Sequence, residues 1–149
     1  MKVPAHLLEL LTVQHHHIDE LLARVRVDQR REHIDELARY VTAHLAVEQE
    51  LLYPRLAARI SDAVRTELLA EHQEIKRVLA NLLWLDEDDG RVAPTLVGLA
   101  ALFEGHSIWQ DEELFESLAE TMSPTALAEL GATVSAGFDW MRNTDLAAA

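Results

Sequence analysis

The sequence predicts an all-α protein, and three observations support this class. Apolar residues recur every three or four positions through nearly the whole chain, which places them on one face of an α-helix. No stretch alternates strictly between apolar and polar residues, as a half-buried strand would. Proline, serine and glycine separate the periodic stretches and suit helix ends. Because the connections are short, we expect an up-down-up-down four-helix bundle with an additional short C-terminal helix.

The first helix is expected to begin after Pro4, because proline suits the first helical position. Its inward-facing residues, three or four positions apart, are Leu8, Leu11, His15, Ile18, Leu22 and Val25. Those of the second helix are Ile34, Leu37, Val41, His44, Glu48 and Leu51. Pro54 has no backbone N–H, so we expect it to kink or end this second helix.

The third helix is expected to start after Ser61, a suitable N-cap, and to stop at the acidic run 86–90. Its inward residues are Val64, Leu68, His72, Ile75, Leu79 and Leu82. A fourth helix is expected after Pro94, ending before Ser123 and Pro124, with inward residues Leu96, Leu99, Phe103, His106, Gln110, Leu114 and Leu118. The shorter fifth helix carries Leu127, Leu130, Val134, Phe138 and Met141 and is expected to pack across an end or a side of the bundle.

Length and composition limit the classes of protein to consider. The 149 residues suffice for one domain, 1–149, in which we expect only the tail 144–149 to be disordered. The absence of cysteine excludes disulfides, thiolate zinc sites and cysteine-bound iron–sulfur clusters. The net charge of −13 disfavours binding to nucleic acid. With no signal-peptide pattern and no run of about 18 apolar residues, we expect a cytoplasmic protein without a membrane partner.

The residues that carry chemistry occupy inward positions of these helices: His15, His44, Glu48, His72 and His106. Burying a carboxylate without a partner costs free energy on the order of several kcal/mol. Buried imidazoles also need hydrogen-bond partners, which Leu and Ile cannot provide. A shared metal cluster would satisfy all of these groups at once. A single histidine of this kind is more often an ordinary core residue, so the alternative is a plain helical bundle with coincidental core histidines.

The spacing of the acidic residues gives two different signals. His44 and Glu48 are one helical turn apart, so both side chains face the same way and can bind the same or adjacent ions. His106 and Asp111 are five residues apart, which turns them about 140° from each other in a regular α-helix. Helical periodicity selects Gln110 instead, so Asp111 would reach the site by local unwinding or at a wide angle around the bundle axis.

Four segments resemble the hemerythrin HHE cation-binding family: QHHHIDELL, HLAVEQELLYP, EHQEIKRVL and HSIWQDEELF. The resemblance spans residues 7 to 118, and its specificity lies in the order H, HxxxE, H, HxxxxD over four helices. It implies a non-haem centre of two iron ions, bridged by carboxylates and an oxo or hydroxo group. His15 and His44 would bind one iron, His72 and His106 the other, and Glu48 and Asp111 would be the bridging carboxylates. Imidazole and carboxylate also suit zinc or manganese, so these remain alternative metals.

Two details of the resemblance concern individual residues. Within the triplet 15–17 we select His15, because it alone lies on the apolar face and Ile18 follows at the spacing seen in the family. Oxygen-carrying hemerythrins have a second histidine one turn after the third-helix histidine, where this chain has Lys76. One iron would then lack a nitrogen ligand, and water, hydroxide, a small anion or another side chain would replace it. Tyr53 is a candidate, although in a regular helix it points away from His44.

Two functional hypotheses follow. The first is a di-iron protein that binds or reacts with dioxygen, peroxide or nitric oxide, as a sensor or as a peroxide-decomposing protein. The incomplete histidine set argues against reversible oxygen storage, because the oxygen carriers share five histidines. The second is a non-enzymatic iron-binding module for iron homeostasis or partner regulation. Whether the protein is an enzyme, and its oligomeric state, stay open at this point.

Overall fold

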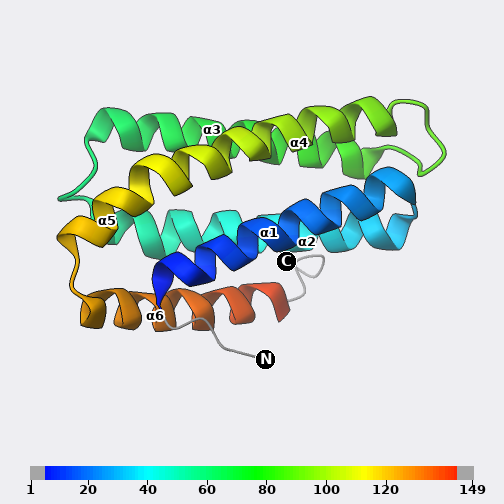
Figure 1. Cartoon of the computed structure of the whole chain (residues 1–149). Coiled ribbons are helices and arrows are strands. Elements are labelled where there is room, and N and C mark those ends of the chain that lie inside the picture. Colours follow the sequence, from blue (N-terminus) through cyan, green and yellow to red (C-terminus); the bar gives the residue numbers. More distant parts are fainter. Residues whose placement is uncertain (1–5, 144–149) are drawn as a thin grey trace.

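The computed structural model describes residues 6–143 (Figure 1), in which nearly every residue is helical and no strand is present. The long helices are α1 (Leu7–Val27), α2 (Arg31–Val47), α3 (Asp62–Trp84), α4 (Val92–Trp109) and α6 (Pro124–Asn143), with α5 (Phe115–Thr121) shorter. The prediction of an all-α protein is confirmed. None of the helices in this part of the chain is long and apolar enough to cross a membrane.

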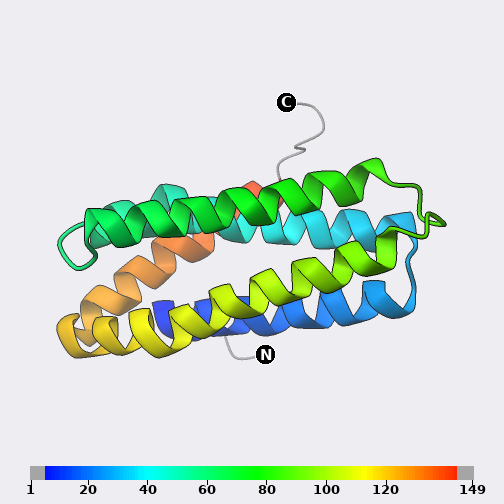
Figure 2. The same cartoon turned by 90° about the horizontal axis from the view of Figure 1, so that it is seen from above.

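The first four helices lie side by side, and the chain reverses direction at each connection between them (Figure 2). α1 packs against α2 and α4, and α3 packs against the same two helices, so the four enclose one interior. The predicted inward positions fill this interior: Ile18, Ile34, Ile75 and Leu96 are each fully buried. Apolar spacing therefore identified the faces that meet.

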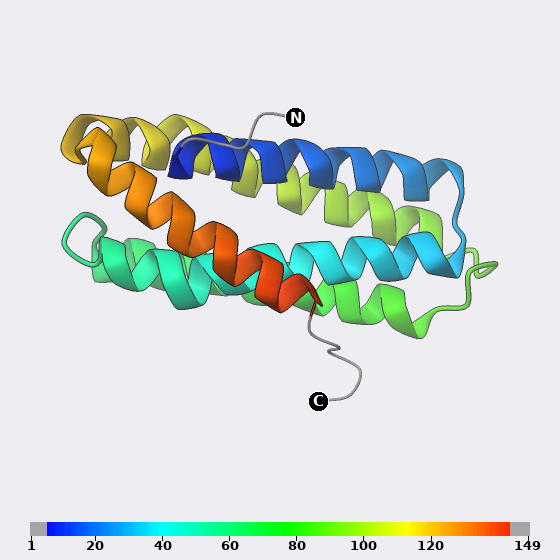
Figure 3. The same ribbon diagram turned by 90° about the horizontal axis from the view of Figure 1, so that it is seen from below.

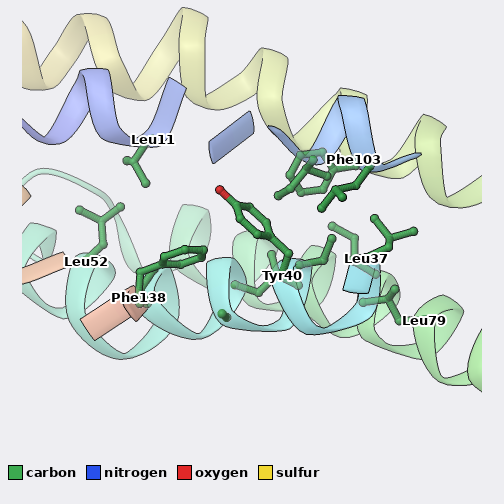
Figure 4. Packing of buried hydrophobic residues seen from close by; sticks show 14 of the residues in the cluster. Leu11, Leu37, Tyr40, Leu52, Leu79, Phe103 and Phe138 are labelled. Atoms are coloured by element: carbon green, nitrogen blue, oxygen red, sulfur yellow. The ribbon is translucent and has the colours of Figure 1, made fainter. Parts of the chain in front are cut away.

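We had predicted a short C-terminal helix, but α6 is 20 residues long. It begins at the predicted Ser123 cap, whose Oγ accepts a hydrogen bond from the Ala126 N–H. Figure 3 shows α6 running diagonally across the side formed by α1 and α2. Packing continues along its whole length: near its end, the Phe138 ring lies 4.9 Å from the Tyr40 ring, centroid to centroid (Figure 4). This tertiary contact sustains a helix longer than sequence pattern alone suggested.

The close approach of α6 to α1 depends on a small residue. A Cβ atom at Gly131 would lie 2.6 Å from the backbone nitrogen of Leu7, closer than real Cβ contacts. Any larger side chain at position 131 would therefore push the two helices apart.

The ends of the other helices agree in part with the predictions. Ser61 caps α3 as expected, because its Oγ accepts a hydrogen bond from the Val64 N–H at 3.1 Å. Helix α4 starts at Val92 and so includes Pro94, which we had placed before it. Proline is tolerated there because N–H groups in the first turn have no partner within the helix. The predicted start after Pro4 and the tail 144–149 lie outside the described residues.

Two segments depart from regular α-helix. The π-helical η1 (Glu48–Leu52) follows α2, and the π-helical η3 (Gln110–Leu114) joins α4 to α5. The N–H of Tyr53 donates a hydrogen bond to the carbonyl oxygen of Glu48, five residues earlier. In the same way, the N–H of Phe115 donates to the carbonyl oxygen of Gln110. Such π turns are rare in proteins, and those that occur are often found at functional sites.

The second helix becomes irregular and ends near Pro54, as predicted: η1 is followed by the 3-10 turn η2 (Tyr53–Leu56), which contains this proline. The π turn before it shifts the buried face by one residue. Leu51, which we had predicted to face the core, is half-buried, whereas Leu52 and Tyr53 are buried. Regular periodicity therefore fails beyond Glu48.

Candidate metal centre

The centre is built around Glu48, whose carboxylate is completely buried where α2 passes into η1. Its Oε1 contacts Nε2 of His44, one turn earlier, and lies 3.0 Å from Nε2 of His106 on α4. Its Oε2 lies 3.8 Å from Nε2 of His72 on α3. Imidazoles from three helices thus surround one carboxylate.

The fourth predicted histidine completes the cluster from α1. The ring of His15 lies 5.1 Å from that of His44 and 5.9 Å from that of His106, centroid to centroid. The rings of His72 and His106 are 5.4 Å apart. Among residues 6–143, one group offers ligand atoms all within 4.8 Å of one another: His15, His44, Glu48 and His106.

The predicted carboxylate from the fourth helix lies at the edge of this cluster. Asp111 approaches it, with Oδ1 3.5 Å from His15 Nδ1, but 48% of its side chain is exposed. The neighbouring Gln110 is fully buried, and its amide donates a hydrogen bond to Oε2 of Glu48. The structure thus brings His15, His44, His72, His106 and Glu48 together and leaves Asp111 half in solvent.

Tyr53 lies in the centre, so the prediction that it points away from His44 was wrong. Its hydroxyl donates a hydrogen bond to Oε2 of Glu48 at 2.7 Å and lies 3.3 Å from Nε2 of His72. The π turn explains the difference, because residues five apart share a side of a π turn and not of an α-helix.

A second layer of side chains, which sequence reasoning missed, holds the histidine rings. Nδ1 of His44 donates to Oε1 of Gln14 at 2.7 Å. Nδ1 of His106 donates to Oε1 of Glu71 at 2.5 Å. Gln14 and Glu71 each directly precede an inward-facing histidine in the sequence, which is the one signal that could have identified them.

Lys76, at the position of the missing family histidine, points to a different partner. Its ammonium group donates a hydrogen bond to Oε1 of Gln49 at 3.2 Å. Because this amino group is directed at Gln49, position 76 contributes no nitrogen ligand to the cluster.

Unpartnered polar atoms test whether a cation fits this interior. Within the described part of the chain, neither ring nitrogen of His15 makes a hydrogen bond of acceptable geometry, nor does Nδ1 of His72 or Oε1 of Gln110. Buried polar atoms are usually hydrogen-bonded, and leaving them unpaired costs free energy. Neutral imidazole and carboxylate are also common ligands of transition metals. The donor set therefore fits a metal centre.

The charges of the metal-free cluster follow from burial and proximity. Burial, with the neighbouring His44, lowers the pKa of His15 to about 3, and burial also lowers the pKa of His44. Burial alone would raise the pKa of Glu48, but His106 and His44 outweigh it and hold that pKa well below its usual value. Burial would lower the pKa of His106, but Glu48 and Glu71 raise it to about 10. One carboxylate and one imidazolium thus face each other.

We expect the metal-free protein to lose stability as the pH falls from about 6.5 towards 3. The pKa of His15 is about 3 in the folded state and 6.5 in the unfolded state, so the unfolded chain binds the extra proton in this window. His44 acts with the same sign, and Glu48 adds to the loss once carboxylates of the unfolded chain become protonated. His106 is protonated in both states below pH 6.5 and therefore contributes constantly there.

Urea unfolding of chelator-treated protein at several pH values between 7.5 and 4 measures this effect. The variant His15→Leu serves as the comparison, because it removes the imidazole whose pKa burial lowers to about 3 and should flatten the pH dependence. A free energy of unfolding that stays constant over this range in the wild-type protein would contradict the prediction.

Comparison with known proteins gives one finding. The family described as the hemerythrin HHE cation binding domain matches residues 6–118. This is more than half of the chain and includes the helices that carry all four histidines, Glu48 and Asp111. Searches of curated proteins and of solved structures gave no significant match. By its sequence match and its buried histidine–glutamate cluster, the chain belongs to the hemerythrin HHE cation-binding family.

Proposed function

We propose that this protein is a non-haem di-iron protein that binds or reacts with small oxygen species, as a sensor or as a peroxide-decomposing protein. The observation that carries the proposal is the convergence of four imidazoles, those of His15, His44, His72 and His106, around the fully buried Glu48. In this proposal α1 to α4 form the up-down-up-down bundle of the hemerythrin type. Metal-ligand energy would then offset the cost of burying these polar groups.

The ligands divide between two ions in this proposal. His15 and His44 would hold one ion, His72 and His106 would hold the other, and Glu48 would be a ligand that both share. Asp111 would be the second shared carboxylate, for which its half-exposed side chain would have to turn inward from its place beside His15.

Tyr53 is the candidate for the donor that Lys76 does not provide. Its hydroxyl oxygen lies 3.3 Å from Nε2 of His72, on the side of the cluster where the family's additional histidine is missing. The hydroxyl is buried, and it also holds its proton toward Oε2 of Glu48. An oxygen donor from the chain is therefore present beside the incomplete half of the centre.

Two iron ions bound here would supply the redox chemistry for dioxygen, peroxide or nitric oxide. The chain's own residues control access and polarity. Phe103 lies beside His15, with ring centroids 5.9 Å apart, and beside His44 at 5.8 Å, so it forms an apolar wall that excludes water. Four members of the cluster are fully buried: His44, Glu48, His72 and His106. This enclosure favours reactants of a few atoms.

Elemental analysis of protein purified from iron-replete cells, without added metal, tests the proposal. We expect about two iron ions per chain, near-ultraviolet absorption of a ferric pair, and a spectral change on adding peroxide. A visible phenolate band that Tyr53→Phe lacks would support Tyr53 as a ligand. Protein that binds no transition metal would overturn the proposal, and zinc or manganese in place of iron would overturn the redox part.

The second candidate function, a non-enzymatic iron-binding module for iron homeostasis or partner regulation, is favoured by the complete burial of the cluster. A centre of this kind can stabilise the fold without admitting a reactant. Iron-loaded protein that shows no response to peroxide, dioxygen or nitric oxide, but melts or binds a partner differently when iron is removed, would support this alternative.

A further inference from the structure

The two histidines nearest to Glu48 are held from behind by chemically different groups. The partner of His44 is the amide of Gln14, which is neutral. The partner of His106 is the carboxylate of Glu71. Both hydrogen bonds leave Nε2 of the histidine directed at Glu48, so His44 and His106 are held in a similar geometry. The two acceptors differ in charge, because one is an amide and the other a carboxylate.

This difference changes the donor strength of the two imidazoles. A hydrogen bond from Nδ1 fixes the tautomer and leaves Nε2 as the ligand atom, whether the acceptor is an amide or a carboxylate. A carboxylate acceptor also makes the imidazole more basic and hence a stronger ligand. His106 should therefore bind a cation more strongly than His44 does.

The two acceptors also differ in their burial. Glu71 is on α3, and 31% of its side chain is exposed, so part of its hydration is retained. It lines a pocket of about 90 Å³ together with Glu67, Leu68 and Trp109. Gln14, by contrast, is 2% exposed, and a charge at that position would be almost completely desolvated.

We propose that Glu71 makes the two halves of the metal centre unequal, so that the ion bound by His106 is held more tightly than the ion bound by His44. Glu71 acts through His106 and is thus a positioning residue. The inference rests on the proposed two-ion centre and extends it, because it assigns an order of loading: the His106 side fills first and empties last.

Anaerobic titration with Fe(II), followed by its release to a coloured ferrous chelator, measures both affinities. We expect two steps in the wild-type protein. Glu71→Gln keeps an acceptor for Nδ1 of His106 and removes the charge, and it should weaken the tighter step about 10- to 100-fold while leaving the weaker step unchanged.

Glu67→Gln is the matched control, because Glu67 lies one turn before Glu71 on α3, lines the same pocket and is exposed. It should release iron as the wild-type protein does. Equal affinities in the wild-type protein, a single ion per chain, or the same weakening in both glutamine variants would overturn the inference. Equal weakening of both steps by Glu71→Gln would also overturn it, because that indicates a structural role. Wild-type protein that binds no Fe(II) would instead contradict the proposed function.

Discussion

Glu48→Gln is expected to abolish stoichiometric metal binding, with affinity falling by more than the roughly 100-fold that outer residues of metal sites control. Glu48 is the only carboxylate in the group of four with closely spaced ligand atoms, and it is fully buried. Glutamine has nearly the same size but no charge, and its NH₂ group donates hydrogen bonds where Glu48 accepts them. The variant thus removes the central anion with little change in packing.

Glu50→Gln is the matched control, because Glu50 lies in the same π turn and is exposed. Metal content by elemental analysis and the Fe(II) titration are compared for both variants, with a thermal melt to show that each is folded. Wild-type metal content in Glu48→Gln, or an equal loss in Glu50→Gln, would contradict a centre built on Glu48.

Removal of the metal is expected to lower the melting temperature substantially. A ligand present at about 1,000 times its dissociation constant stabilises the folded state by about 4 kcal/mol. In a chain of about 150 residues each kcal/mol shifts the melting temperature by about 2–4 °C, so chelation should lower it by roughly 8–16 °C. The measurement is a pair of thermal melts, one of iron-loaded protein and one of chelator-treated protein.

His44→Leu provides the comparison for this experiment. It removes a fully buried ligand atom next to Glu48, so its melting temperature should no longer depend on iron. Equal melting temperatures of loaded and chelated wild-type protein would favour a plain helical bundle with coincidental core histidines.

Sequence periodicity was sufficient to find the inward-facing imidazoles. His15, His44, His72 and His106 each take a place that an apolar residue would otherwise occupy, and each is buried. The signal is strong because a polar residue on an apolar helical face needs a partner, and the helices bring the partners to the same depth.

Periodicity could not find residues whose position depends on π turns. Pro54 is a local reason for an irregular turn after Glu48, but nothing in the sequence 110–114 marks the second π turn. Tyr53 was therefore placed on the wrong side. The same limitation left the choice between Gln110 and Asp111 open.

Sequence patterns also could not predict which side chains of different helices contact each other. Gln14 and Glu71 bind histidines on other helices, 30 and 35 residues away along the chain. A pattern within one helix contains no information on which side chain of a neighbouring helix lies opposite, because that depends on the relative rotation and height of both.

The two π turns make residue count as important as residue identity. Each contains one residue more than a regular α-helical turn would need. Deletion of one residue between Glu48 and Tyr53 would place the tyrosine four residues after the glutamate, on the same face of a regular α-helix. A sequence comparison in this stretch must therefore take the type of turn into account, because five residues in a π turn and four in an α-helix bring the same pair of side chains together.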